Sequence, residues 1–319
     1  MKIFKAYSEG FKAAGKSKKT ALVIYLITFL FALTLALPFR GMLKQTAGNS
    51  MAINSMIKGF DFTTYTDFLR SAGHAIEPFV SAVIWSGIFY LVFTIFFAGG
   101  VLKILNSGSM KFSAVAFFEG CAEYFFRYLR LAIYLIILQL IFAFIVFIPT
   151  GIIAAAAVGT VQNEAVLFYI VLTGIIVYLL FLVLGLTIGD YAKIILFING
   201  SKKSLKSVWL AARFVIKHFF STYFLYLILL IAPALLILVY FYLDNAVGMV
   251  SASTIFIMFI IQQIFILARS WIKIWFTGSE LSLYKMFPAM EVFPGERHAE
   301  HDAKLNNDSQ ELLQNPQTP

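Results

Sequence analysis

Three glutamines are the polar side chains nearest the middle of long apolar segments in this sequence. Gln139 lies in one segment, and Gln262 and Gln263 lie together in another. An amide inside a membrane must bond to a neighbouring helix or face a polar cavity, because lipid offers it no partner. Hydrogen bonding between helices is the simpler interpretation. The alternative is that these amides line a polar cavity.

A second group of polar residues lies near the ends of the apolar segments. Asp190 is the most deeply placed acid, and Lys193 follows it by about one helical turn. Lys103, Arg269 and Lys273 have comparable depths in two other segments. We predict that these residues form a charge cluster at the cytoplasmic interface. A salt-bridged structural contact is the simpler interpretation, and a contact to a headgroup or substrate is the alternative.

Closely spaced glycines mark places where helices can approach each other. Gly185 and Gly189 form a G-x-x-x-G pattern, and Gly99 and Gly100 are adjacent near the end of another apolar segment. Small residues at such positions are typical of helix–helix contacts in membranes. We therefore predict packing roles for these glycines.

Enzyme and cofactor signatures are missing from the sequence. It contains no G-x-S-x-G motif, no Walker phosphate loop and no H-E-x-x-H motif. His298 and His301 have a spacing that a metal could use but no partner ligand, and Cys121 is the only cysteine. We predict no enzymatic activity, no catalytic residue, no cofactor and no metal site.

The composition is that of a protein embedded in lipid. Charged residues make up 13% of the chain and apolar residues 61%. In a soluble domain roughly a quarter of the residues are charged and roughly half are apolar. The net charge of +9 comes from Lys and Arg beside the apolar segments, not from a basic face interleaved with aromatic residues. This distribution favours a membrane protein and argues against a nucleic-acid partner.

Six segments are long and apolar enough to cross a bilayer, which needs about 20 residues at 1.5 Å each. The predicted spans are 20–38, 79–105, 128–149, 165–196, 219–242 and 249–276. Their apolar runs are continuous and lack the alternation of a β-barrel. We predict an all-α integral membrane protein with six transmembrane helices.

The distribution of Lys and Arg predicts the orientation. Six lysines precede the first span, whereas the links after spans three and five contain no Lys or Arg. Basic residues resist translocation, so both termini should face the cytoplasm of a bacterial cell, with the chain in the cytoplasmic membrane. The long outer loop 39–78 contains Asp61 as a plausible N-cap of a short helix.

A basic amphipathic stretch precedes each pair of spans. In the first stretch Phe4, Tyr7 and Phe11 recur at helical spacing, and in the third Val208 and Ala212 do so; the middle stretch, 112–126, is more apolar. Such stretches are typical of helices lying in the plane of the cytoplasmic interface, with lysines reaching toward headgroups.

The three pairs of spans also resemble one another in sequence. The segment EGFKAAG at Glu9 resembles EGCAEYF at Glu119, and Tyr-Leu-Ile recurs in the first span of each pair. A lysine followed by a glycine closes each second span, at Lys103, Lys193 and Lys273 with Gly108, Gly200 and Gly278. We predict one transmembrane domain, 1–286, with a threefold repeat of about 1–108, 109–200 and 201–286. The polar tail 287–319 is predicted to be disordered and cytoplasmic.

This layout resembles a broad group of bacterial six-span membrane proteins of unknown function. The group includes the membrane domain that precedes the catalytic domain of some glycerophosphodiester phosphodiesterases. The amphipathic stretches, the paired spans and basic residues such as Lys103 and Lys193 carry the resemblance over residues 1 to about 286. It implies a shared layout, and it transfers no catalytic residue because the hydrolase domain is not in this sequence.

The sequence favours a lipid-associated or membrane-protein-organising component. Its basic in-plane helices would contact anionic headgroups, so the expected partners are membrane lipids and other membrane proteins. The alternative is a transporter or channel for a small or amphiphilic solute, with a path near Gln139, Gln262 and Gln263. No ionisable residue lies at an estimated midplane, which speaks against an ion-coupled carrier.

Overall fold

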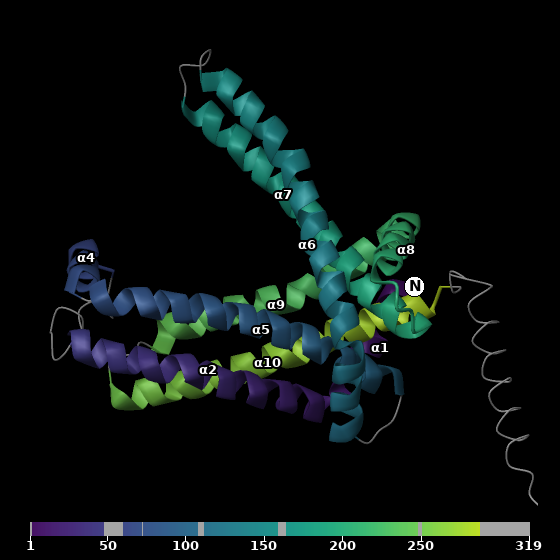
Figure 1. The fold of residues 1–319 in the computed structure, drawn as a ribbon, viewed down its shortest axis with the longest axis horizontal. Coiled ribbons are helices and arrows are strands. Elements are labelled where there is room, and N and C mark those ends of the chain that lie inside the picture. Colours follow the sequence, from purple (N-terminus) through teal and green to yellow (C-terminus); the bar gives the residue numbers. More distant parts are fainter. Residues whose placement is uncertain are drawn as a thin grey trace, which may run out of the picture. The chain divides into compact units, whose positions relative to one another are not determined.

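The computed structural model describes residues 2–47, 60–71, 73–107, 112–158, 164–247 and 251–287. Across these ranges the chain is helical, and they contain no β-strand (Figure 1). The helices are α1 (Lys2–Lys16), α2 (Lys18–Ala47), α4 (Phe62–Ser71), α5 (Gly73–Ser107), α6 (Ala114–Val158), α7 (Glu164–Asn199), α8 (Ser204–Lys217), α9 (Phe219–Val247) and α10 (Ala252–Lys285). The predicted tail, with His298 and His301, lies outside these ranges apart from its first residue.

Within the described ranges, six helices are long and apolar enough to cross a membrane: α2, α5, α6, α7, α9 and α10. The mean hydropathy of their apolar windows ranges from 1.9 to 3.0. The protein is therefore an all-α, six-span membrane protein, which confirms the predicted fold class. The short helix after Asp61 is also present as α4, and Asp61 Oδ1 accepts a hydrogen bond of 2.9 Å from the Thr63 backbone N–H.

Several helices extend beyond the predicted spans. Span three was expected to end at Pro149, but α6 runs on to Val158 with this proline inside it. Span six was expected to end at Phe276, but α10 continues to Lys285. The middle amphipathic stretch, 112–126, is not a separate helix either. From Ala114 it forms the beginning of α6, whereas α1 and α8 are separated from the following span by Ser17 and His218.

Buried side chains gather at one end of the spans. We call this region the junction; it comprises α1, α8, residues 114–131 of α6, and residues 97–107, 187–199 and 272–284 of α5, α7 and α10. Large side chains that are almost fully buried there include Leu102, Phe117, Leu131, Tyr191 and Ile274. Farther along the same helices most large apolar side chains are exposed, as expected where lipid is the solvent.

Glycines allow two close helix contacts at the junction. A Cβ atom added to Gly99 of α5 would clash with the backbone carbonyl oxygen of Gly120 in α6. A Cβ atom added to Gly10 of α1 would clash with the side chain and backbone of Ser279 in α10. Figure 1 shows α1 beside the end of α10, where the Trp275 Nε1–H donates a 3.2 Å hydrogen bond to the Tyr7 carbonyl oxygen.

A third contact joins α8 to the end of α7. The rings of Phe214 and Tyr191 have centroids 5.2 Å apart, and Phe214 also contacts Tyr284 of α10 at 5.1 Å. Ser207 and Ala211 of α8 are buried on the same helix. The three amphipathic stretches thus each pack on the final part of a span.

Candidate functional site

Two glycines of α7 create space between α6 and α7. A Cβ atom added to Gly189 would lie 2.9 Å from the Leu135 Cδ1 atom, and one added to Gly185 would clash with the amide of Gln139. The two helices pack against each other as a hairpin (Figure 1). Because the glycines have no side chains, the Gln139 side chain fits between the helices.

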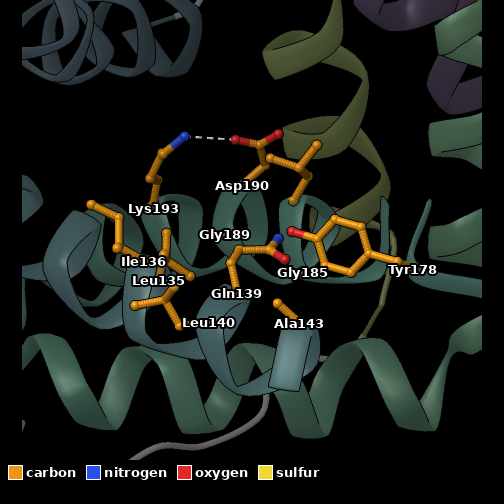
Figure 2. Close-up of a pocket in the computed structure, with 11 residues that line it drawn as sticks. Leu135, Ile136, Gln139, Leu140, Ala143, Tyr178, Gly185, Gly189, Asp190 and Lys193 are labelled. Carbon is orange, nitrogen blue, oxygen red and sulfur yellow. Dashed lines mark hydrogen bonds and ion pairs between the residues drawn. The ribbon is translucent and has the colours of Figure 1, made fainter. Parts of the chain in front are cut away.

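A groove of about 310 Å³ runs between these helices. Most of its lining is apolar and includes Ile136, Leu140, Ala143 and Leu186. Figure 2 shows the polar groups that also line it: Tyr178, Gln139, Asp190 and Lys193. The groove is therefore amphipathic, which suits a molecule with an apolar body and a polar end.

An ion pair forms the polar end of the groove. The Lys193 Nζ atom lies 2.7 Å from the Asp190 Oδ1 atom, one helical turn away on α7. Their side chains are 36% and 29% exposed, so both charges remain accessible from the groove. Tyr128 of α6 fixes the helix at this point, because its hydroxyl donates a 3.2 Å hydrogen bond to the Lys193 carbonyl oxygen.

The amide of Gln139 is only partly satisfied. Its Nε2 atom donates a 3.2 Å hydrogen bond to the Leu182 carbonyl oxygen. Its Oε1 atom is buried and has no hydrogen-bond partner within the described part of the chain. Leaving such an acceptor unpaired costs about 1–3 kcal/mol.

The other two glutamines bond to different helices. The Gln262 Nε2 atom donates a 3.2 Å hydrogen bond to the Tyr240 hydroxyl of α9. The Tyr25 hydroxyl of α2 donates a 3.1 Å hydrogen bond to the Gln263 Oε1 atom. Of the three glutamines, Gln139 alone lines the groove.

Three residues expected in the charge cluster lie within electrostatic range of a fourth, Lys273. Lys273 of α10 interacts with Asp190, Lys193 and Arg269. Lys103 has different partners, because its Nζ atom lies 3.1 Å from Glu119 and 3.7 Å from Glu123, both on α6.

Glu280 is a member of this charged region that the sequence analysis missed. It is 2% exposed, and it lies within electrostatic range of Asp190 and Lys193. The predicted span six ended at Phe276, before Glu280, although the predicted domain 1–286 contained this residue. A usable signal was present, since Thr277-Gly-Ser-Glu280 in α10 parallels Thr187-Ile-Gly-Asp190 in α7.

A basic pocket of about 350 Å³ lies between α6 and the beginning of α8. Its lining residues are Arg130 and Tyr134 of α6 together with Lys202, Lys203, Ser204, Leu205 and Lys206. The Ser204 hydroxyl donates a 3.0 Å hydrogen bond to the Arg127 carbonyl oxygen, which holds the two helices together here. The amphipathic character of α8 is evident in the sequence, whereas the contribution of α6 to this pocket is not.

The groove and the basic pocket are separate sites. Arg130 and Gln139 are nine residues apart on α6, and 100° per residue puts them about 180° apart around the helix axis. One small molecule therefore cannot occupy both.

Comparisons of this chain with protein-family models, curated proteins and solved structures find no match. The chemistry of the groove, the ion pair and the basic pocket is therefore the basis for a function.

Proposed function

We propose that this chain is a non-enzymatic, lipid-associated membrane protein whose basic pocket binds anionic phospholipid headgroups. The observation that carries this proposal is that one pocket is lined by four basic residues. Arg130 comes from the membrane-spanning helix α6, and Lys202, Lys203 and Lys206 come from the beginning of α8 and the residues before it. A phosphate group would find several cationic donors within one pocket. Each basic residue near an anionic leaflet contributes about 1 kcal/mol of attraction.

The apolar face of α8 supports the same proposal. Trp209 is 72% exposed and Leu205 is also exposed, although both are large apolar side chains. A helix with exposed apolar residues on one face and lysines on another favours the headgroup region of a bilayer. There the apolar side chains enter the acyl region and the lysines reach phosphate groups.

Native mass spectrometry of the protein in mixed micelles tests this proposal. We expect the wild type to retain an anionic phospholipid in preference to a zwitterionic one. The variant K202Q/K203Q/K206Q should lose this preference by on the order of 10- to 100-fold in affinity, given the contribution of each charge. The variant R40Q/K44Q/R70Q removes the same charge from the predicted outer side and serves as the control. Equal retention in all three proteins would contradict the proposal.

We further propose that the chain lies in a bacterial cytoplasmic membrane with both termini in the cytoplasm. The basic pocket and the lysines of α1 support this orientation, because basic residues are retained on the cytoplasmic side. The anionic lipids of that leaflet would then face the basic pocket.

An internal threefold repeat remains part of the proposal, and matching contacts support it. Gly120 of α6 packs against Gly99, and Gly10 of α1 packs against Gly278. These contacts align Gly99 with Gly278. The alignment based on the closing lysines, Lys103 and Lys273, instead pairs Gly108 with Gly278. The resemblance to the six-span bacterial group likewise remains a prediction.

Polar contacts follow the same alignment. Glu119 of α6 forms an ion pair with Lys103, and Glu9 of α1 accepts a hydrogen bond from Ser282. Since Glu9 and Glu119 begin the matching EG segments, Lys103 corresponds to Ser282. Each contact joins the beginning of one predicted repeat to the end of the preceding one, and α1 with α10 would close the series.

A transporter of an amphiphilic solute is the second candidate, and the α6–α7 groove favours it. Its apolar lining ends at the Asp190–Lys193 ion pair, and the unpaired Gln139 oxygen lies between. We expect Q139L to abolish flux of such a solute in proteoliposomes while leaving thermal stability nearly unchanged. Q262L is the control, because Gln262 bonds to Tyr240 and does not line the groove. If Q139L lowers thermal stability and reduces flux no more than Q262L does, Gln139 is a packing residue and the transport proposal is contradicted.

A further inference from the structure

Glu280 is enclosed by several helices at the junction. Its own helix, α10, contacts α1 through Ser279, whose side chain faces Gly10. The same helix contacts α8 through the rings of Tyr284 and Phe214. Tyr191 of α7 and Tyr226 of α9 lie within its electrostatic range. The carboxyl group is therefore surrounded by protein and has little access to water.

Two polar atoms near this position have no partner. The Glu280 Oε1 atom and the Tyr191 hydroxyl are both buried, and neither forms a hydrogen bond with any described residue. Tyr191 is 0% exposed. A buried carboxylate without donors is strongly unfavourable in its ionised form, whereas the protonated carboxyl group is neutral and can itself donate a hydrogen bond.

The two carboxyl groups of this region, Asp190 and Glu280, both interact with one lysine, Lys193. From α7, Asp190 and Lys193 face this region, and they already form a 2.7 Å ion pair. Lys273 of α10 lies within electrostatic range of Asp190 and of Arg269. Lys193 is the cation that interacts with both carboxyl groups, so a second negative charge on Glu280 would compete with Asp190 for it.

We propose that Glu280 is a proton-binding site that controls the polar end of the α6–α7 groove. In the protonated state Glu280 is neutral and Lys193 pairs with Asp190. When the Glu280 O–H bond breaks, the proton leaves for the solvent and the carboxylate attracts the Lys193 ammonium group. Asp190 then loses its partner and faces the groove as an unpaired anion. This site does not depend on lipid binding at the basic pocket.

Infrared spectroscopy of the purified full-length protein tests the protonation state directly. We expect a carbonyl band of a protonated carboxylic acid at neutral pH, shifted in deuterated buffer. The band should be lost in E280Q and kept in E77Q, whose Glu77 is exposed at the other end of α5. A wild type without this band, or an E280Q variant that keeps it, would overturn the proposal.

A second variant keeps the proposal testable if E280Q does not fold. D190N removes the competing carboxylate, so Lys193 becomes available to Glu280 and should stabilise its ionised form. We expect the protonated band to weaken in D190N at neutral pH. An unchanged band in D190N would show that Lys193 does not link the two acids, and would contradict the proposed switch.

Thermal unfolding against pH provides an independent readout. At neutral pH the folded protein holds a proton on Glu280, whereas the unfolded chain has already lost it. The free energy of unfolding should therefore fall as the pH rises. The E280Q variant has no titratable group at this position. Its unfolding temperature should therefore depend less on pH than that of the wild type or of E77Q. Identical pH profiles for all three proteins would count against a proton at Glu280.

Discussion

Single residues set the distance between helices at the junction. Gly99 and Gly120 bring the backbones of α5 and α6 into contact, whereas Gly185 and Gly189 of α7 make room for the Gln139 and Leu135 side chains of α6. Packing roles for the glycines of α5 and α7 follow from their spacing alone. Their partners do not, because an apolar segment composed of few residue types does not specify which helix it contacts.

Gly99→Ala should destabilise the protein. The added methyl group meets the backbone carbonyl oxygen of Gly120, which cannot move away as a flexible side chain could. Overpacking of this kind costs about 1–3 kcal/mol. We expect a lower unfolding temperature in detergent, measured by differential scanning fluorimetry.

Gly87→Ala is the matched control for this substitution. Gly87 lies on the same helix with nothing within 4 Å of an added Cβ atom. Alanine is the better helix former by up to about 1 kcal/mol, so this variant should be as stable as the wild type or more stable. Equal destabilisation by both substitutions would show that the Gly99 contact is absent.

At the scale of the helices, six spans follow directly from hydropathy, but their ends do not. Hydrophobicity falls after Phe276, so the predicted span stopped there and Glu280 lay beyond its end. Helical hydrogen bonding continues through polar residues where packing supports it, and α10 therefore reaches Lys285. The same reason explains why the stretch before span three is the beginning of α6.

Gly10→Ala should detach α1 from the end of α10. A methyl group at this position clashes with the backbone of Ser279, and the hydrogen bond from Trp275 to the Tyr7 carbonyl oxygen depends on the same contact. We expect faster trypsin cleavage at the lysines of α1. In Gly15→Ala the added methyl group meets nothing within 4 Å, so the cleavage rate should equal that of the wild type. Equal rates in all three proteins would contradict the docking of α1.

At the scale of the whole molecule, the described helices expose large apolar side chains over most of their length. Phe144, Ile152 and Ile237 are typical examples outside the junction. Such surfaces are stable in lipid, so the membrane environment follows from composition and from the fold alike. The partner of each site does not follow, since recognition depends on a few polar groups such as Lys193 and Glu280 whose neighbours come from distant parts of the chain.

Cysteine labelling in intact cells tests the proposed orientation. Cys121 is buried and is the only cysteine, so new cysteines can be labelled over a low background. We expect D67C to react with a membrane-impermeant reagent from outside, and K206C to react only after the membrane is opened. The reverse pattern would overturn the assignment of the basic pocket to the cytoplasmic leaflet.

Fluorescence quenching of Trp209 by brominated lipids tests the central claim, anionic lipid association at α8, most directly. Trp209 is exposed on α8 next to the basic pocket, and its signal is obtained by subtracting the spectrum of W209F. In proteoliposomes of mixed composition we expect a brominated anionic phospholipid to quench Trp209 more strongly than a brominated zwitterionic one. The difference should disappear in K202Q/K203Q/K206Q. Equal quenching by both lipids in the wild type would show that α8 does not select anionic headgroups.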